Sequence, residues 1–411
     1  MDDRIGRVNT KLLYEEDAYI REFEATVTGC VKAEPGDKKK DLYIIELDKT
    51  AFFPEGGGQS SDTGFIEDAA VSHVTLEGGR VLHTTDKAFE EGTVVKCRID
   101  FAKRYDRMQN HSAEHLLCGL IHNATGFDNV GFHLGDDETI LDLNGPVSAE
   151  LLSELELKAN RIIYENVPIT AAIYSGDELK SIDYRSKLDI TENVRIVTIE
   201  GYDKCACCAP HVRTTGEIGS IKVVDFAPHR GGTRIAIIAG ERAFKDHVML
   251  DESNRKIMAL LSTKRPEGAK GTEQLLNRNL ALNGELVSIK KELTSMVFNG
   301  VKNGLVGKTD EKPVLVFSEN FDEIMMRNLI NDTLKLTEAA VAGFMGNDEK
   351  GYRYIIGAHK EKGILYGGEY EALPAFAKKF NESLSGRGGG SPLMIQGSVT
   401  GRRKDIEEFF G

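Results

Sequence analysis

Two short stretches of the sequence contain residue types that bind transition metals. In the first, His111 and His115 stand four residues apart, and in an α-helix this spacing places both imidazoles on one face. In the second, Cys207 and His211 stand at the same spacing and offer a thiolate and a third imidazole. Three imidazoles and one thiolate match the ligand types and the number that zinc prefers. The sequence therefore predicts a zinc site.

The chemistry of such a site depends on whether one metal position stays open. A site closed by four protein ligands is structural, whereas an open position binds water or substrate. The His-Glu-x-x-His signature of one metalloprotease class is absent, because Ser112 follows His111. No convincing Ser–His–Asp set occurs elsewhere, so metal-dependent hydrolysis is the chemistry that the residues favour. The choice of thiolate ligand is open among Cys205, Cys207 and Cys208.

Length and charge limit the class of protein. The chain has 411 residues, of which 40% are hydrophobic and 28% charged, which is typical of a soluble protein with two to four domains. No apolar run reaches the roughly 20 residues that a membrane helix needs, and no signal-peptide core is present. We therefore expect a cytoplasmic protein without a membrane partner. The net charge of −13 argues against indiscriminate nucleic-acid binding, so a nucleic-acid partner would contact local basic clusters such as 402–404.

The six cysteines fall into two groups. Three of them lie within 205–208, which suits a metal site in a reducing compartment better than a disulfide framework. The other three are expected to be small buried apolar residues: Cys30, Cys97 and Cys118.

Residues 1–100 are predicted to form a small antiparallel β-barrel. Strand-like runs, separated by glycine and aspartate clusters, occur at 23–31, 42–47 and 94–100. The most informative loop ends in Gly-Gly-Gly-Gln at 56–59. Three successive glycines let a backbone approach a ligand closely and turn its N–H groups outward. A flexible hairpin turn is the alternative.

Residues 101–239 contain the metal-binding residues and are predicted to form an α+β domain. A helix should carry His111 and His115 and continue to about Ala124. A second helix is expected over 148–165, where apolar residues recur at helical spacing. Strands are expected at 139–143, 194–199 and 219–224, so that the last two flank Cys207.

Residues 240–300 are predicted to form a helical hairpin whose connection spans 263–271. In the second arm a heptad seam of apolar residues, interrupted by the polar Asn279, consists of Leu275, Leu282, Ile289 and Met296. Whether this seam closes within one chain or between two is open. The seam leads us to expect a homodimer through the C-terminal half.

Residues 301–411 are predicted to form a small α/β domain. Its expected strands are at 313–317, 339–344 and 352–357, and its expected helices are at 321–336 and 370–384. Near the end, Arg387 stands among the glycines of 386–390 and precedes a strand. An arginine among glycines can hold a phosphate, and a solvent-exposed loop is the alternative.

Three motifs resemble, in their order and separation, the editing domain of alanyl-tRNA synthetases. They are Phe-Phe-Pro-Glu-Gly-Gly-Gly-Gln at 52–59 with Asp62 and Gly64, His-x-x-x-His-Leu-Leu at 111–117, and Cys-x-x-x-His-Val at 207–212 with Thr-Gly-Glu-Ile-Gly at 215–219. Gly-Thr-Arg-Ile at 232–235 resembles the passage out of that domain. The helical hairpin and the last glycine-rich stretch resemble the synthetase's DHH-associated domain, so the resemblance covers nearly the whole chain. The family's aminoacylation domain has no counterpart here, and we expect a free-standing editing protein of the long AlaX type.

The resemblance implies a reaction and a set of site residues. The reaction would be hydrolysis of the ester that joins a wrong amino acid, serine or glycine, to alanine tRNA. One zinc ion per chain would be bound by His111, His115, Cys207 and His211. The aminoacyl-adenosine end would contact Gly56, Gly57, Gly58, Gln59 and His133. The tRNA body would contact Arg387, Gly388, Gly389 and Gly390.

One motif departs from the family, and other functions compete with hydrolysis. Where the family has Cys-Gly-Gly-Thr-His, residues 207–211 are Cys-Cys-Ala-Pro-His, so Pro210 offers no backbone N–H and Cys208 could bind the metal. A tRNA-binding protein with a purely structural zinc would contain the same motifs. A phosphoesterase is disfavoured because the Asp-His-His motif is absent. The sequence does not decide between serine and glycine, or which group transfers the proton.

Overall fold

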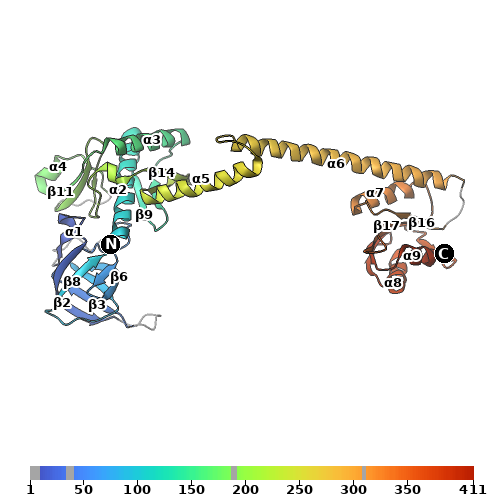
Figure 1. Cartoon of the computed structure of the whole chain (residues 1–411), viewed down its shortest axis with the longest axis horizontal. Helices are drawn as coiled ribbons and strands as arrows, with labels where there is room; N and C mark the ends of the chain where they lie inside the picture. Colours follow the sequence, from blue (N-terminus) through green and yellow to red (C-terminus); the bar gives the residue numbers. More distant parts are fainter. Residues whose placement is uncertain (1–9, 34–40, 187–191, 308–311) are drawn as a thin grey trace. The chain divides into compact units, whose positions relative to one another are not determined.

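The computed structural model describes residues 10–33, 41–186, 192–307 and 312–411. The chain divides into two compact units, residues 1–255 and residues 256–411 (Figure 1). Both units combine helices with strands, so the predicted α+β class is confirmed. No described helix is both long and apolar enough to cross a membrane. A finer division stays a prediction, with boundaries at 1–100, 101–239, 240–300 and 301–411.

Six antiparallel strands near the N-terminus form a ring-like sheet in the order β2-β3-β7-β6-β5-β8, which closes where β8 pairs with β2. Their bounds are Glu22–Lys32 (β2), Tyr43–Leu47 (β3), Gly64–Ile66 (β5), Ala69–Glu77 (β6), Arg80–Thr85 (β7) and Val94–Ile99 (β8). Buried and exposed residues alternate along β8, as expected for a strand with one face toward a core. This ring-like sheet occupies the place of the predicted barrel.

Three short elements adjoin the ring-like sheet. Strands β1 (Lys11–Leu12) and β4 (Lys49–Thr50) pair in parallel, and the helical turn α1 (Leu13–Glu16) follows β1.

The cysteines outside 205–208 were expected to be buried. Cys97 and Cys118 are buried, whereas Cys30 is only partly buried.

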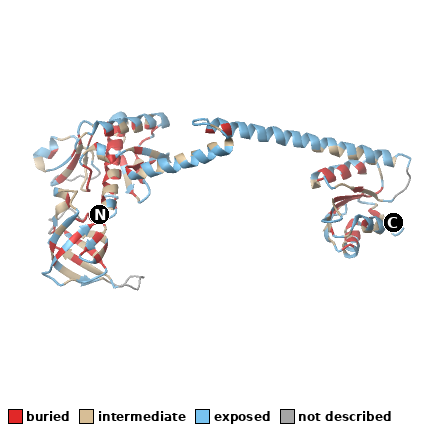
Figure 2. Cartoon of the chain, viewed as in Figure 1, coloured by how far each residue is buried: buried red, intermediate tan, exposed pale blue. Residues whose placement is uncertain are grey.

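Helix α2 (Phe101–Thr125) is the centre of the first unit and is buried over most of its length (Figure 2). It begins after Asp100, whose side chain accepts a hydrogen bond from the amide of Lys103, and it ends at Gly126, which has a left-handed φ of 74°. Both are common helix boundary signals. Because the buried residues of α2 include Arg104 and His111, these polar groups require partners inside the protein.

Two sheets and helix α3 (Ala149–Glu165) pack around α2. The four-stranded sheet has the order β14-β15-β10-β9 and the three-stranded sheet has the order β11-β12-β13. Helix α3 begins after Ser148, whose hydroxyl accepts a hydrogen bond from the amide of Leu151. The other bounds are β9 (Asn129–Leu134), β10 (Thr139–Leu143), β11 (Ile169–Tyr174), α4 (Gly176–Lys180), β12 (Val194–Ile199), β13 (Asp203–Ala206), η2 (Thr215–Ile218), β14 (Ile221–His229) and β15 (Gly232–Ala239).

Two long helices follow, α5 (Glu241–Leu261) and α6 (Gly268–Leu305). The predicted connection at 263–271 is wrong at its end, because α6 already begins at Gly268. A side chain at Gly271 would place Cβ 2.6 Å from Cγ2 of Thr263, so this glycine permits the close turn between the helices. The heptad seam residues of α6 are each more than half exposed: Leu275, Leu282, Ile289 and Met296. The described part of the chain therefore leaves the seam uncovered.

The second unit contains a five-stranded sheet in the order β16-β17-β18-β22-β21. Alternate residues of β17 belong to two clusters: Val341 and Met345 pack with α7, while Ala342 and Phe344 pack with α8 and α9. The helices therefore cover both faces. The bounds are β16 (Val314–Phe317), α7 (Glu323–Leu334), β17 (Val341–Asn347), β18 (Gly351–Gly357), β19 (Ile364–Tyr366), β20 (Glu369–Glu371), α8 (Leu373–Ser383), β21 (Arg387–Gly390), β22 (Met394–Val399) and α9 (Arg403–Phe410).

The glycine-rich stretch near Arg387 is a strand, so the alternative of a solvent-exposed loop is wrong. Strand β21 pairs antiparallel with β22 at the edge of the sheet. A Cβ at Gly388 would lie 2.6 Å from the hydroxyl of Tyr354, and a Cβ at Gly397 would lie 2.7 Å from the same ring. The absence of side chains at these two glycines lets the buried Tyr354 ring pack closely against strands β21 and β22. Arg387 is exposed at the edge of the sheet.

Candidate metal centre

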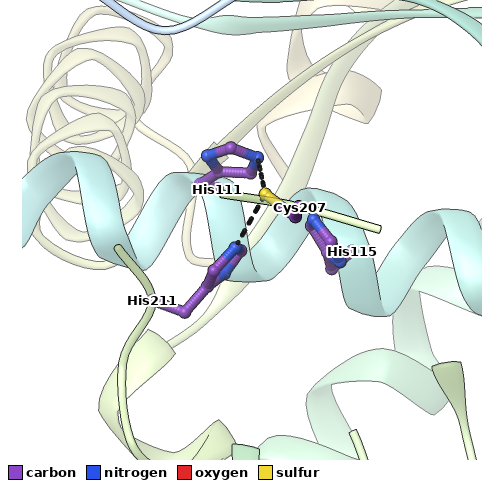
Figure 3. Close-up of side chains that lie close together, drawn as sticks. All are labelled: His111, His115, Cys207 and His211. Carbon is purple, nitrogen blue, oxygen red and sulfur yellow. Dashed lines mark hydrogen bonds between the residues drawn. The ribbon is translucent and has the colours of Figure 1, made fainter. Parts of the chain in front are cut away.

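The structure brings the four predicted metal ligands together. His111 and His115 lie on α2, Cys207 follows β13, and His211 lies in the loop before η2 (Figure 3). One possible ligand atom from each residue lies within 4.8 Å of the others. The Cys207 Sγ is 3.6 Å from Nε2 of His111 and 3.4 Å from Nε2 of His211. Tetrahedral ligands at ~2.0–2.3 Å from zinc are separated from one another by about 3.5 Å, so this spacing suits one small cation.

The three cysteines that could supply a thiolate have different surroundings. Burial raises the pKa of Cys207, but the neighbouring imidazoles lower it by more, and the pKa falls well below its usual value. Burial raises the pKa of Cys205 to about 11, so this thiol stays protonated. Cys205 forms a second group with His115 and Asp203, and within the described residues Cys208 belongs to neither group. The geometry therefore favours Cys207.

Hydrogen bonds at Nδ1 orient two of the imidazoles. His111 Nδ1 lies 2.7 Å from Oε1 of Gln59, and because an amide oxygen only accepts, His111 carries its proton on Nδ1. Its Nε2 lone pair then faces Cys207, in the form that binds a metal. The hydroxyl of Ser112 lies 3.0 Å from Nδ1 of His211 and can accept in the same way. Burial lowers the pKa of His211 to about 3, which keeps that ring neutral.

The triple-glycine segment is a tight turn that rests on strand β9. Gly56 and Gln59 exchange two backbone hydrogen bonds, each of 3.1 Å, and Gly57 and Gly58 have φ values of 62° and 86°. The carbonyl of Gly58 accepts a hydrogen bond from the amide of Leu134. A Cβ on Gly58 would lie 2.4 Å from a β9 carbonyl oxygen, so only glycine fits there. The turn thereby holds Gln59 beside α2.

A buried ion pair clamps both arms of this loop to α2. The Arg104 guanidinium donates to the carboxylate of Asp62 and, at 2.6 Å, to the carbonyl of Ala51. Asp62 also accepts a hydrogen bond of 2.6 Å from the amide of Phe53. Both charged side chains are almost fully buried. This clamp was not predicted from the sequence, although Arg104 precedes His111 by two helical turns and so shares its face.

Phe132 adjoins the metal-binding set, whereas His133, the predicted substrate contact, does not. The Phe132 ring lies 4.7 Å from the His111 ring. Successive residues of a strand point to opposite sides, and His133 is exposed. The structure therefore does not bring His133 into the set, and its contact with a substrate stays a prediction.

Arg195 holds the segment whose sequence departs from the family's usual motif. Its Nη1 donates to the carbonyl of Cys207 at 2.9 Å and to the carbonyl of Ala209 at 3.0 Å. Ala209 is buried against Tyr14 and Phe53. This segment is therefore fixed by an arginine on β12 and by apolar packing, and neither feature was predicted from the sequence.

Family models match two parts of the chain. Residues 194–237 match the model described as the threonyl and alanyl tRNA synthetase second additional domain. Residues 5–103 match the model of class II (A) tRNA synthetases. The first match contains Cys207 and His211, and the second contains the triple-glycine turn and Gln59.

Individual proteins match over a longer span. The alanyl-tRNA editing protein Aarsd1 of Rattus norvegicus is 27% identical over 410 residues, which cover 96% of each chain. The alanyl-tRNA editing protein AlaX-L of Pyrococcus horikoshii is 26% identical over 413 residues, again 96% of each chain. This chain is a homologue of the alanyl-tRNA editing proteins over nearly its whole length. An alanine–tRNA ligase of Ignicoccus hospitalis is 33% identical over 296 residues, which form 69% of this chain but 31% of the ligase.

Replacing Arg104 by methionine should destabilise the first unit by about 3–5 kcal/mol, because it leaves a buried Asp62 carboxylate without its cation. The matched control is Arg80→Met, since Arg80 contacts Glu46 at 2.8 Å but its side chain is 54% exposed. That change should cost less than about 1 kcal/mol. Urea unfolding followed by circular dichroism, with hydrogen exchange of the α2 amides, measures both effects. Equal losses of unfolding free energy in the two variants would contradict a stabilising role for the buried Arg104–Asp62 pair.

Proposed function

We propose that this protein hydrolyses the ester bond of mischarged tRNA(Ala) and acts in trans, as a separate editing protein. The observation that carries this proposal is the buried set of three histidines and Cys207 in a chain homologous to alanyl-tRNA editing proteins over nearly its whole length. The resemblance implies serine or glycine as the wrong amino acid.

We further propose that the set binds one zinc ion per chain. The proposed ligands are His111, His115, Cys207 and His211. A thiolate and neutral imidazoles are the protonation states that zinc requires, and the lowered pKa values of Cys207 and His211 favour them at these two of the four ligands. A zinc ion at such a site supplies positive charge that polarises an ester carbonyl or lowers the pKa of a bound water.

Gln59 supports the proposal that the aminoacyl end binds beside the triple-glycine turn. Its Oε1 contacts His111, while its Nε2 is buried and has no hydrogen-bond partner among the described residues. A buried donor without a partner costs free energy, and a substrate oxygen would satisfy it. A Cβ on Gly57 would have no atom within 4 Å, so there is open space beside the proposed adenosine contacts Gly56, Gly57 and Gly58.

We propose that the second unit binds the tRNA body through Arg387 with Gly388, Gly389 and Gly390. Arg387 supports this part because it presents an exposed cation on the edge strand β21.

We also propose a cytoplasmic location. All six cysteines lie in the described residues and none forms a disulfide, which fits a reducing compartment.

A second candidate is a tRNA-binding protein whose zinc is structural. The observation that favours it is that four protein side chains already offer the number of ligands that a structural zinc site uses. The two candidates differ in one respect, because only the hydrolase turns over an aminoacyl-tRNA.

The purified full-length protein should contain zinc and should deacylate Ser-tRNA(Ala) or Gly-tRNA(Ala) faster than Ala-tRNA(Ala). His115→Ala should remove the metal and lower the deacylation rate at least about 100-fold, with tRNA binding largely retained. The matched control is His122→Ala, since His122 lies on the same helix but its side chain is 38% exposed, and this variant should keep both zinc and activity. Zinc content with no deacylation of either mischarged tRNA would favour the binding protein.

We propose that two chains associate through the seam of α6. Apolar residues at heptad spacing that stay exposed in one chain support this proposal, because a partner helix would bury them. Leu282→Glu should convert a dimer to a monomer in analytical ultracentrifugation. Val287→Glu changes an equally exposed apolar residue outside the seam and should leave the dimer intact. A wild-type monomer, or dissociation in both variants, would overturn the proposal.

A further inference from the structure

A buried pair of charges contacts one of the proposed ligands. Arg185 Nε lies 2.8 Å from Oδ1 of Asp203, and Arg185 Nη2 lies 3.0 Å from Oδ2. The same Oδ2 lies 3.3 Å from Nδ1 of His115. The exposed fractions of the side chains are 13% for Arg185, 2% for Asp203 and 3% for His115. These contacts form a continuous chain from a cation through a carboxylate to the imidazole.

The backbone around Asp203 fixes this chain of contacts. Gly119 lies one turn after His115 on α2, and a Cβ there would be 2.8 Å from the carbonyl oxygen of Tyr202 and 2.6 Å from Cβ of Asp203. The bare glycine lets β13 approach α2. Arg185 is held to β13 by backbone hydrogen bonds to the carbonyl of Lys204 and from the amide of Ala206. Both charged residues are therefore placed by the backbone as well as by their side chains.

The three imidazoles differ in what contacts Nδ1. His111 has the neutral amide of Gln59 and His211 has the neutral hydroxyl of Ser112, whereas His115 has a carboxylate. Nδ1 of His115 makes no hydrogen bond within the described residues, and Asp203 faces it at ion-pair distance. A carboxylate that takes the Nδ1 proton as a hydrogen bond fixes the tautomer and the ring orientation and makes the imidazole a stronger donor at Nε2. His115 is thus the one of the three imidazoles whose Nδ1 faces a charged group.

We infer that Asp203 is a positioning residue for metal binding, which holds His115 with Nδ1 toward the carboxylate and Nε2 available to the metal, and that Arg185 holds the carboxylate in place. This inference rests on the proposed zinc site. Neither residue is a proposed ligand, and neither contacts the reacting ester in the proposed function.

The same geometry permits a competing arrangement. Ligand atoms of His115, Asp203 and Cys205 also lie within 4.8 Å of one another and could bind a separate cation. Arg185 opposes this arrangement, because its guanidinium engages both carboxylate oxygens and places a positive charge beside the site. The number of metal ions bound per chain distinguishes a single site at the four proposed ligands from a second site that uses Asp203 and Cys205.

The test is Asp203→Asn in the full-length protein, with metal binding as the readout. Zinc affinity, measured by competition with a chromophoric chelator, should fall about 10–100-fold. The visible absorption bands of the cobalt-substituted protein should change, because they report ligand geometry. Asp203→Glu should recover part of the affinity. The matched control, Asp177→Asn, removes an almost fully exposed carboxylate that pairs with Lys180 and should change neither quantity.

Several outcomes would overturn the inference. Wild-type zinc affinity and an unchanged cobalt spectrum in Asp203→Asn would show that the carboxylate does not position His115. Two metal ions per wild-type chain would favour the competing site. If Asp203→Asn does not fold, Arg185→Lys, which keeps the charge but loses the two-point contact, should weaken zinc binding about 10-fold, and unchanged binding would refute the inference. A wild-type protein that binds no zinc would instead refute the proposed metal site.

Discussion

The buried ion pair between Arg104 and Asp62 joins the ring-like sheet to the helix that carries two of the histidines. Two charges withdrawn from water are tolerated only when hydrogen bonds satisfy them. Here the guanidinium also donates to the carbonyls of Ala18 and Ala51, and the carboxylate also accepts the amide of Phe53. Because these contacts fix the loop from 50 to 62 on α2, Gln59 can reach His111 from 52 positions away in the sequence.

The other half of the centre is fixed by different means. Cys207 and His211 follow a strand that lies against α2 where Gly119 has no side chain. Arg195 then holds the carbonyls of Cys207 and Ala209. The unusual Cys-Cys-Ala-Pro-His sequence is compatible with this arrangement, since the arginine contacts backbone oxygens that any residue provides, and Ala209 packs in an apolar cluster. In each half a buried polar side chain of α2 contacts a residue from another element, since His111 contacts Gln59 and Ser112 contacts His211.

Local patterns in the sequence predicted the longer helices and some of the strands, because helix and strand periods depend on neighbouring residues. The i, i+4 spacing of His111 and His115 placed them correctly on one helix. The contacts of Gln59, Arg104 and Asp203 could not be predicted, because each joins segments far apart in the sequence. The strand at 387–390 was not predicted, because its four residues are an arginine and three glycines, a composition that disfavours strands, whereas the packing of Tyr354 against two strands requires glycine there.

A single metal ion held by His111, His115, Cys207 and His211 is the claim on which the proposed reaction and the role of Asp203 both depend. X-ray absorption at the zinc edge of the purified, full-length protein tests it most directly. The predicted result is three nitrogen ligands at about 2.0–2.1 Å and one sulfur ligand at about 2.3 Å. Two or more sulfur ligands would place Cys205 or Cys208 on the metal, and a shell without sulfur would exclude Cys207. Either result would contradict the assignment.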